Sequence, residues 1–420
     1  LPYSKGGELS PYYSDVELLL RAKNDLTEIK AALNKKYPYL KGNLSWVLHP
    51  ENSYFEPGLT FGQRTTFLRV SILPAGCYFS VAGKGIFGRS LSNKAILQLM
   101  NTPTAQYLIS LRRESWEMNP QYQEGDVARM PWPDIPMAAL QAFEQTGLES
   151  AEKVRRVASF DEVDHSFVYT KNPEEIEDAR AQAQIVIELN EKRADLSFSS
   201  YLGLDEQDRN FIDQEIIPRW HSRSAANWYA PSDKDRIQYM TGLAYGRWDI
   251  RFASGERQSP KLTDLFATLP VCSPGMLQNT HGLPAEPKDV PADYPLRISW
   301  HGILVDSENH PEDIVTRIED VLKVIWKDRW EAIEQETCEL LGVKTLRDYF
   351  RRPPGFFADH LKRYSKSRRQ APIYWPLSTA SCSYTLWIYY HRLTDQTLHT
   401  ALADFVDPKL KSVRTEISSL

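Results

Sequence analysis

Short stretches of the first 135 residues carry apolar side chains at every second position, a period that predicts β-strands. Val16, Leu18 and Leu20 form one such stretch. A second and longer β-rich stretch covers residues 66–83, and its Pro-Ala-Gly sequence at 74–76 predicts a turn. The proline-rich residues 130–136 are expected to close this strand-rich part of the chain.

Helical periodicity replaces the alternation after Ser92, where the apolar residues at 96, 99 and 100 share one helical face until Pro103 interrupts. A polar helical pattern then covers residues 137–197. Within it Pro173 follows Asn172 and precedes two glutamates, which is typical of a helix start. We interpret residues 137–197 as a helical connector.

The remainder of the chain mixes both patterns. It predicts, in order, a helix at 205–217 stopped by Pro218, a helix at 232–245, a long proline-rich surface loop at 270–295, a strand at 297–305, a long helix from Pro311, a hairpin of residues 373–379 and 384–390, and a helix at 394–418. The predicted fold class is therefore α+β. We expect a β-rich module at 1–136, the connector at 137–197 and a mixed α/β C-terminal region at 198–420.

Charge and cysteine content narrow the class of protein. The chain has 420 residues, 50 basic and 55 acidic side chains and a net charge of -5, so its total charge gives no sign of nucleic-acid binding. Its 4 cysteines are far apart and form no CxxC pair, which argues against a zinc ribbon or a disulfide framework. There is no apolar run of membrane-spanning length and no signal peptide, so we expect a cytoplasmic protein.

Three short motifs suggest enzymatic sites but lack the surroundings that each chemistry needs. Residues 83–88 match GxGxxG, yet no ribose-binding acid follows before Arg113, so we interpret them as a glycine-rich turn that approaches a phosphate. Asp264 and residues 286–288 resemble a nuclease metal site but include a proline where a strand is required. Residues 352–355 (Arg-Pro-Pro-Gly) lack the polar and aromatic neighbours of an amino-methyltransferase loop. We expect no catalytic residue, metal site or cofactor in this chain.

Positive charge is concentrated near the C-terminus. Residues 347–370 contain eight Lys or Arg and two Asp, and five of these cations lie within residues 361–369. Interleaved hydroxyls and a tyrosine suit contact with phosphate oxygens, although a run of charge is more often a solvated face. Arg64, within residues 63–66, is a second candidate because arginine can bind the major-groove edge of guanine.

Four segments resemble, in this order, the target-recognition region of large adenine-specific DNA methyltransferases: residues 59–66 (LTFGQRTT), 73–80 (LPAGCYFS), 96–111 (ILQLMNTPTAQYLISL) and 125–133 (GDVARMPWP). Residues 346–379 (LRDYFRRPPGFFADHLKRYSKSRRQAPIYWPLST) resemble the C-terminal region of these enzymes. The similar group comprises the type IIG restriction-modification enzymes and the methyltransferases of the BREX and DISARM phage-defence systems. The resemblance is thinnest over residues 140–195.

The resemblance implies sequence-specific recognition of double-stranded DNA for adenine N6 methylation. In this family the catalytic domain, which binds S-adenosylmethionine and carries an Asn-Pro-Pro-Tyr loop, precedes the recognition region. We therefore expect the catalytic domain to lie outside this chain, in the same polypeptide or in a separate subunit, and the chain alone to be inactive. Expected DNA contacts are Lys5, Arg64, Thr65, Lys84 and Arg89 in the first module, and Arg351, Arg352, Lys362, Arg363, Lys366, Arg368 and Arg369 in the C-terminal region.

Two other functions stay open on the sequence alone. One is a protein-interaction scaffold within a phage-defence complex, which would use the many Trp and Tyr side chains for partner proteins and the basic run for an acidic protein. The other is an independent nuclease or methyltransferase, which would bind a metal ion or S-adenosylmethionine without a partner.

Overall fold

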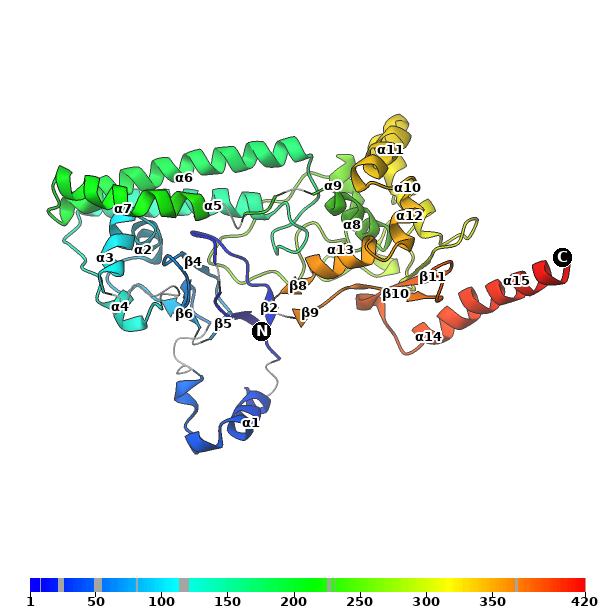
Figure 1. Cartoon of the computed structure of the whole chain (residues 1–420), viewed down its shortest axis with the longest axis horizontal. Coiled ribbons are helices and arrows are strands. Elements are labelled where there is room, and N and C mark those ends of the chain that lie inside the picture. The colour runs from blue at the N-terminus through cyan, green and yellow to red at the C-terminus, as the bar shows by residue number, and fades with distance from the viewer. Residues whose placement is uncertain are drawn as a thin grey trace. The chain divides into compact units, whose positions relative to one another are not determined.

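A computed structural model describes residues 1–7, 9–21, 26–48, 55–80, 82–112, 121–224, 228–230, 232–366 and 369–419. The chain folds into two compact units, whose elements are labelled in Figure 1. Unit 1 comprises residues 1–166, 172–230 and 261–270, and unit 2 comprises residues 167–171, 231–260 and 271–420. Helices and small sheets occur together in the molecule, so the predicted α+β class is confirmed.

The larger sheet of unit 1 consists of β4 (Val70–Leu73), β3 (Gly58–Gly62) and β6 (Gly83–Ile86), in that spatial order. All neighbours are antiparallel, and Leu59 of the central strand pairs with Ile72 on one side and Ile86 on the other. Every residue of β3 and β4 is buried, which agrees with their nearly continuous apolar sequence.

A second sheet of unit 1 has the order β2 (Leu18–Leu19), β1 (Pro2–Ser4) and β5 (Tyr78–Phe79), and its β1 and β5 run parallel. The stretch at 66–83 is therefore divided between two sheets. Its predicted turn is present, with Gly76 at φ 77°, where glycine avoids the steric cost of a Cβ atom. The strands before and after this turn pair with different partners and form no hairpin with each other.

The glycine-rich motif at 83–88 begins as a strand, so its interpretation as a turn is wrong. Gly83 and Gly85 both belong to β6. A Cβ atom on Gly83 would lie 2.4 Å from the backbone nitrogen of Gly6, and one on Gly85 would lie 2.7 Å from the Phe87 ring. Glycine at position 83 thus allows β6 and the segment around Gly6 to pack closely.

Unit 1 also contains α1 (Thr27–Lys36), α2 (Asn93–Met100), α3 (Pro103–Ser110), α4 (Glu124–Ala128), α5 (Met137–Ala158), α6 (Pro173–Tyr201) and α7 (Glu206–Ser224). The helix predicted after Ser92 is confirmed, and the Ser92 hydroxyl accepts a hydrogen bond from the Ala95 N–H at 3.2 Å. Pro103 interrupts that helix as predicted, and it is also the first residue of α3.

Pro218 does not stop the helix that contains it. α7 continues to Ser224, so the predicted end at residue 217 is wrong. A proline inside a helix removes one backbone hydrogen bond and bends the helix. Ile212 and Ile216, just before the proline, are buried against Phe67, and this packing offsets the local cost.

The two helices of the predicted connector pack inside unit 1. α5 lies against both α6 and α2. A Cβ atom on Gly147 of α5 would lie 2.7 Å from the backbone oxygen of Lys94, so glycine allows these helices to approach closely. Phe143 and Phe198 join the same core as Leu59 of the sheet. Residues 137–166 and 172–197 thus belong to one compact unit with the preceding strands, whereas residues 167–171 belong to unit 2. The division of function between modules stays a prediction.

Unit 2 contains α8 (Asp233–Ala244), α9 (Ile250–Ser254), α10 (Ile314–Trp326), α11 (Trp330–Leu341), α12 (Leu346–Arg351) and α13 (Phe356–Arg363). The predicted helix at 232–245 is confirmed. The helix predicted from Pro311 begins at Ile314 instead, because the Asp313 carboxylate accepts a hydrogen bond from the Thr316 N–H at 3.1 Å and caps the helix there.

The sheet of unit 2 has the antiparallel order β10 (Tyr374–Ser378), β11 (Thr385–Tyr389) and β7 (Ile303–Val305). The predicted hairpin is confirmed as β10 and β11, whereas only the last three residues of the strand predicted at 297–305 form a strand. One face of the sheet contributes Tyr374, Trp387 and Tyr389 to the main core. β10 is an edge strand.

Two further segments belong to unit 2. The proline-rich residues 270–295 include the short helix η4 (Pro287–Asp289), and Leu277 and Ala285 are buried with Ile298, so this segment is not purely the surface loop expected. The helix predicted at 394–418 is confirmed as α14 (Thr397–Thr400), one π-helical stretch (Ala401–Val406) and α15 (Asp407–Ser419).

Candidate nucleic-acid interface

A small basic hairpin follows α13 in unit 2. β8 (Ser365–Lys366) pairs antiparallel with β9 (Arg369–Gln370), which places Lys366 directly opposite Arg369. Both side chains are exposed. Two exposed cations on paired strands place positive charge together at one point of the surface. We call residues 365–370 the basic hairpin. Arg368, another expected contact, lies outside the described residues.

The base of the basic hairpin is fixed to the body of unit 2. The Ala371 N–H donates to the backbone oxygen of Tyr364 at 2.9 Å and closes the hairpin. The Arg247 guanidinium lies 4.3 Å from the ring centroid of Trp248 and 5.5 Å from that of Tyr364, and it donates to the Tyr364 hydroxyl. These contacts restrict the hairpin at its two ends before any ligand binds.

His360 anchors the segment on both sides of the hairpin. Its Nδ1 lies 2.7 Å from Gln238 Oε1, and its Nε2 accepts hydrogen bonds from the N–H groups of Ile373 and Tyr374 at 2.9 and 3.2 Å. This arrangement requires the neutral ring with its proton on Nδ1. Burial, reinforced by the positive charge of Arg247, lowers the pKa of His360 to about 3.

The cations at the end of α13 differ in their surroundings. Lys362 is exposed, whereas the Arg363 side chain is only 12% exposed and forms an ion pair with Asp235. Asp235 also accepts a hydrogen bond from the Ser232 N–H at 3.2 Å at the start of α8. Arg363 thus joins α13 to α8, and both cations favour the helix C-terminus electrostatically.

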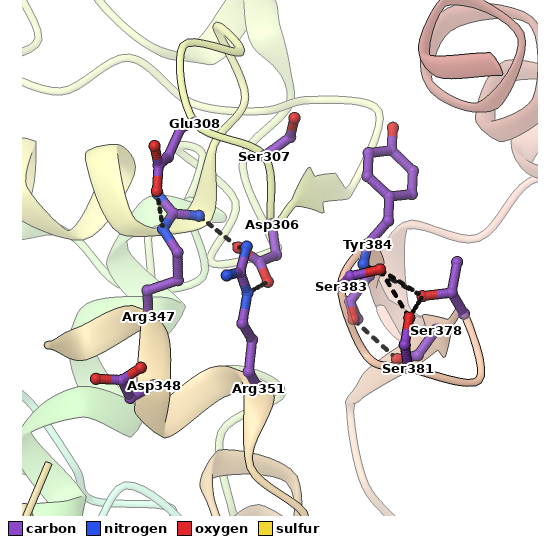
Figure 2. Close-up of polar contacts among 12 residues, drawn as sticks. Asp306, Ser307, Glu308, Arg347, Asp348, Arg351, Ser378, Ser381, Ser383 and Tyr384 are labelled. Carbon is purple, nitrogen blue, oxygen red and sulfur yellow. Dashed lines mark hydrogen bonds and ion pairs between the residues drawn. The ribbon is translucent and has the colours of Figure 1, made fainter. Parts of the chain in front are cut away.

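Arg351 and Arg352 at the end of α12 also bond within the protein. Figure 2 shows both Arg347 and Arg351 reaching the Asp306 carboxylate, and Arg351 Nε lies 2.5 Å from Asp306 Oδ2. Arg352 donates to the carbonyl oxygens of Leu341 and Gly342, at the end of α11, at 3.0 and 3.3 Å. Both arginines therefore stabilise helix ends and turns of unit 2.

Asp306, Arg347 and Arg351 form a charged cluster, in which Arg347 is more deeply buried than Arg351. The Arg347 and Arg351 side chains are 12% and 39% exposed, and that of Asp306 is 1% exposed. Arg347 also donates to Asp313 Oδ2 at 2.8 Å, and these carboxylates raise its pKa although burial opposes the charge. The cluster is a satisfied ion-pair network that links the end of β7 to α12.

The expected contacts of unit 1 fall into exposed and buried groups. Lys5, Arg64 and Arg89 are exposed, and Arg89 lies 3.4 Å from Glu56 Oε2. Thr65 is buried and its hydroxyl donates to the Phe67 carbonyl oxygen at 2.5 Å. Among the expected contacts of unit 1, Lys5, Arg64 and Arg89 therefore present their charge to solvent.

Lys84 is buried in β6, and its ammonium group lies 3.3 Å from both Gln123 Oε1 and Glu124 Oε1. Its neighbourhood includes the chain segments of Lys5 and Arg64. A Cβ atom on Gly83 would lie 2.8 Å from the carbonyl carbon of Lys5, and one on Gly62 would lie 2.3 Å from the backbone oxygen of Gly7. The fold therefore brings together segments that are far apart in sequence.

Sequence reasoning found the cations of unit 2 but missed the residues that fix them. Phe356, His360 and Tyr364 follow one another at every fourth position, which was the available signal for one face of a helix. Their rings are in contact: those of Phe356 and His360 lie 5.8 Å apart and those of His360 and Tyr364 4.6 Å apart. No local pattern indicates that Arg247 reaches the same site.

The part of the chain that the structure describes contains neither a metal-binding cluster nor a membrane-spanning helix. There, no three His, Cys, Asp or Glu side chains gather in a way that could hold a metal ion. Glu286 is the N-cap of η4, and Pro287 and Lys288 belong to that helix, so the motif does not lie on a strand. Lys288 Nζ lies 2.8 Å from Glu286 Oε2. None of the described helices is both long and apolar enough to cross a membrane.

Comparison with known proteins supports the resemblance seen in the sequence. No protein-family model matches the chain. Among curated proteins, the chain is similar to the adenine-specific methyltransferase BrxX of Escherichia coli O9:H4 (strain HS), with 23% identity over 471 aligned residues. The alignment covers 100% of this chain and 34% of the relative, so the chain spans about a third of that protein's length. The similarity supports a relationship between this chain and the BREX-type adenine-specific methyltransferases.

Proposed function

We propose that this chain is the DNA-binding part of a BREX-type adenine-specific methyltransferase and contacts double-stranded DNA. The observation that carries the proposal is the basic hairpin, because Lys366 and Arg369 are exposed and face each other across a strand pair. Two neighbouring cations of this kind suit the phosphates of a duplex, whose negative charges are closely spaced. The similarity to BrxX supplies the class of enzyme.

In this proposal the two units contribute different cations. Lys362, Lys366 and Arg369 bind phosphates from unit 2, with Arg368 as a further expected contact at the hairpin. Lys5, Arg64 and Arg89 are the accessible candidates of unit 1. Thr65, Lys84, Arg351, Arg352 and Arg363 support the surfaces that carry these cations, because their polar groups bond within the protein. The catalytic domain and its S-adenosylmethionine are proposed to lie outside this chain.

Fluorescence anisotropy with a labelled duplex at low salt tests the proposal. The unmodified chain is expected to bind, and the double variant Lys366→Glu with Arg369→Glu is expected to bind at least about tenfold more weakly, because two phosphate contacts become repulsive. A matched control is Lys411→Glu with Arg414→Glu on α15, which changes the net charge equally and should bind as the unmodified chain does. Equal weakening by both variants would contradict a role for the hairpin.

A second candidate function, a protein-interaction scaffold, is favoured by the C-terminal helices. α15 buries none of its side chains, and its Leu410 and Ile417 are 47% and 66% exposed. Apolar side chains left in solvent along a helix are typical of a surface that a protein partner covers. Capture of a partner protein together with no duplex binding at low salt would favour this function over DNA contact.

A further inference from the structure

An exposed tryptophan lies on the edge strand that follows the basic hairpin. Trp375 of β10 is 46% exposed, although large aromatic side chains are usually well buried in monomeric proteins. Its ring centroid lies 6.2 Å from that of Phe357 on α13, so one part of the ring is supported by the body of unit 2. The rest of the ring is open to solvent and available for a ligand.

The backbone of this edge strand is blocked against the addition of another strand. Ile373 with Tyr390 and Thr379 with Tyr384 are hydrogen-bonded pairs of the hairpin, because the Tyr390 N–H donates to the Ile373 oxygen at 2.8 Å and the Thr379 N–H donates to the Tyr384 oxygen at 3.0 Å. Such pairs alternate along antiparallel strands, so the N–H positions of residues 374, 376 and 378 face outward from the sheet.

Two of these three outward positions cannot donate to a partner strand. The Tyr374 N–H already donates to His360 Nε2 at 3.2 Å, and Pro376 has no N–H. An edge with so few donors is a poor template for strand addition by another protein. The surface that β10 offers is therefore made of side chains.

The side chains on either side of Trp375 suit a nucleic-acid backbone. The basic hairpin ends at Gln370, five residues before Trp375, which limits their separation to about 18 Å even for an extended chain. At the other end of β10, Figure 2 shows Ser378, the last residue of the strand, near Ser381 and Ser383 of the turn that leads to β11. The Ser381 and Ser383 hydroxyl oxygens lie 2.8 Å apart. Cations and hydroxyls are the groups that bind phosphate oxygens in protein–DNA complexes.

We propose that Trp375 stacks on an unpaired base of DNA whose backbone is held by the basic hairpin. The proposal rests on the DNA contact proposed above and specifies what this part of unit 2 recognises. A base that has left the duplex exposes its ring faces, and an aromatic side chain beside phosphate-binding cations can bind one of them regardless of sequence. A fully paired duplex offers no such face along its length.

The test compares two labelled probes that differ in one nucleotide: a short duplex with one unpaired thymine and the same duplex fully paired. Trp375→Ala in the full chain should weaken binding to the first probe at least about fivefold while changing binding to the second less than about twofold. Trp375→Phe should restore most of the lost affinity, because its ring still stacks. Tyr390→Ala removes a comparably exposed aromatic side chain (55%) and should change neither affinity.

The outcomes separate this inference from the proposed function. If Trp375→Ala weakened binding to both probes equally, or to neither, the stacking role would be wrong. If the chain bound neither probe at low salt, the DNA function itself would be wrong. Circular dichroism and thermal unfolding of each variant check that the fold persists, which is expected because the Trp375 ring is largely at the surface.

Discussion

Asp306 holds two arginine side chains while being almost completely removed from water. Its Oδ1 atom accepts a hydrogen bond from Arg351 Nη2 at 3.1 Å, in addition to the bonds shown in Figure 2. A buried ion pair of this kind adds little stability compared with an apolar core, but loss of one partner leaves uncompensated charge. The effect of removing this carboxylate should therefore be large compared with that of a surface carboxylate.

Asp306→Asn is expected to lower the free energy of unfolding by about 3 kcal/mol, because Arg347 loses a charged partner in a buried site. The matched control is Glu308→Gln, since the Glu308 side chain is 73% exposed and lies 3.5 Å from the same Arg347. We expect the control to change stability by less than about 1 kcal/mol. Urea unfolding of both variants measures the difference, and equal effects would show that the buried network has no special role.

Because the buried His360 side chain is neutral, the free energy of unfolding should depend on pH. The pKa of His360 is about 3 in the folded protein, below the ordinary histidine value of about 6.5. The unfolded chain therefore binds this proton first as the pH falls, and protonation favours unfolding. The contribution of His360 is complete above about pH 6.5 and declines toward about pH 3, by at most about 1.4 kcal/mol per pH unit.

Comparison of the unmodified chain with His360→Asn isolates this effect. The variant should be less stable by about 1–3 kcal/mol at neutral pH, because it loses ring packing and part of the hydrogen bonding. The difference should narrow as the pH falls below about 6.5, since only the unmodified chain loses the contribution of this histidine. Urea unfolding over a pH series measures it, and a difference independent of pH would contradict the neutral buried ring.

The candidate site shows which properties of single residues the sequence can predict. The exposed Lys362, Lys366 and Arg369 lie in a region whose composition is plainly basic. Composition alone does not distinguish these exposed cations from the largely buried Arg363, because Asp235, the ion-pair partner of Arg363, is far away in sequence. Exposure of a cation depends on which distant carboxylate the fold places beside it, and local charge patterns contain no such information.

The close crossing at β6 depends on the absence of a side chain. Gly83→Ala is expected to lower the free energy of unfolding by about 2 kcal/mol or more, because its methyl group would overlap the backbone at Gly6 and push β6 away from the segment that follows β1. The control is Gly125→Ala in α4, where an added Cβ meets no atom within 4 Å. That change should be neutral or stabilise by up to about 1 kcal/mol.

Thermal or urea unfolding of the two glycine variants distinguishes packing from the ligand-binding role first suggested by GxGxxG. A destabilised Gly83→Ala with unchanged Gly125→Ala agrees with a structural glycine. Unchanged stability of Gly83→Ala would mean that the two segments at this crossing can separate without cost, and the packing account of the motif would be wrong.

Elements with strong local signals were predicted more accurately than their pairings. Ser92, and Pro173 after Asn172, marked the starts of α2 and α6 because capping and proline preferences act within one helical turn. The helix end predicted at Pro218 is wrong, because Ile212 and Ile216 pack against Phe67, which is far away in sequence. The stretch at 66–83 was likewise predicted as strand, but its division between two sheets depends on partners far along the chain.

For the molecule as a whole, the total charge argues against DNA binding, whereas the local charge of the basic hairpin argues for it. The net charge of -5 disfavours DNA, whereas the basic hairpin presents positive charge on a fixed support in unit 2. Contact with DNA in this account is therefore local, and it should depend on a few cations instead of on the charge of the chain. This distinction gives the account a quantitative test, because each phosphate contact releases condensed counterions.

The most direct measurement is the salt dependence of duplex binding by the unmodified chain and by Lys366→Glu with Arg369→Glu. The account predicts that the logarithm of the binding constant falls linearly with the logarithm of salt concentration, and that the double variant has a slope shallower by about two. The α15 variant of equal charge should keep the original slope. An unchanged slope in the hairpin variant, or binding that does not respond to salt, would contradict the proposed contact with DNA.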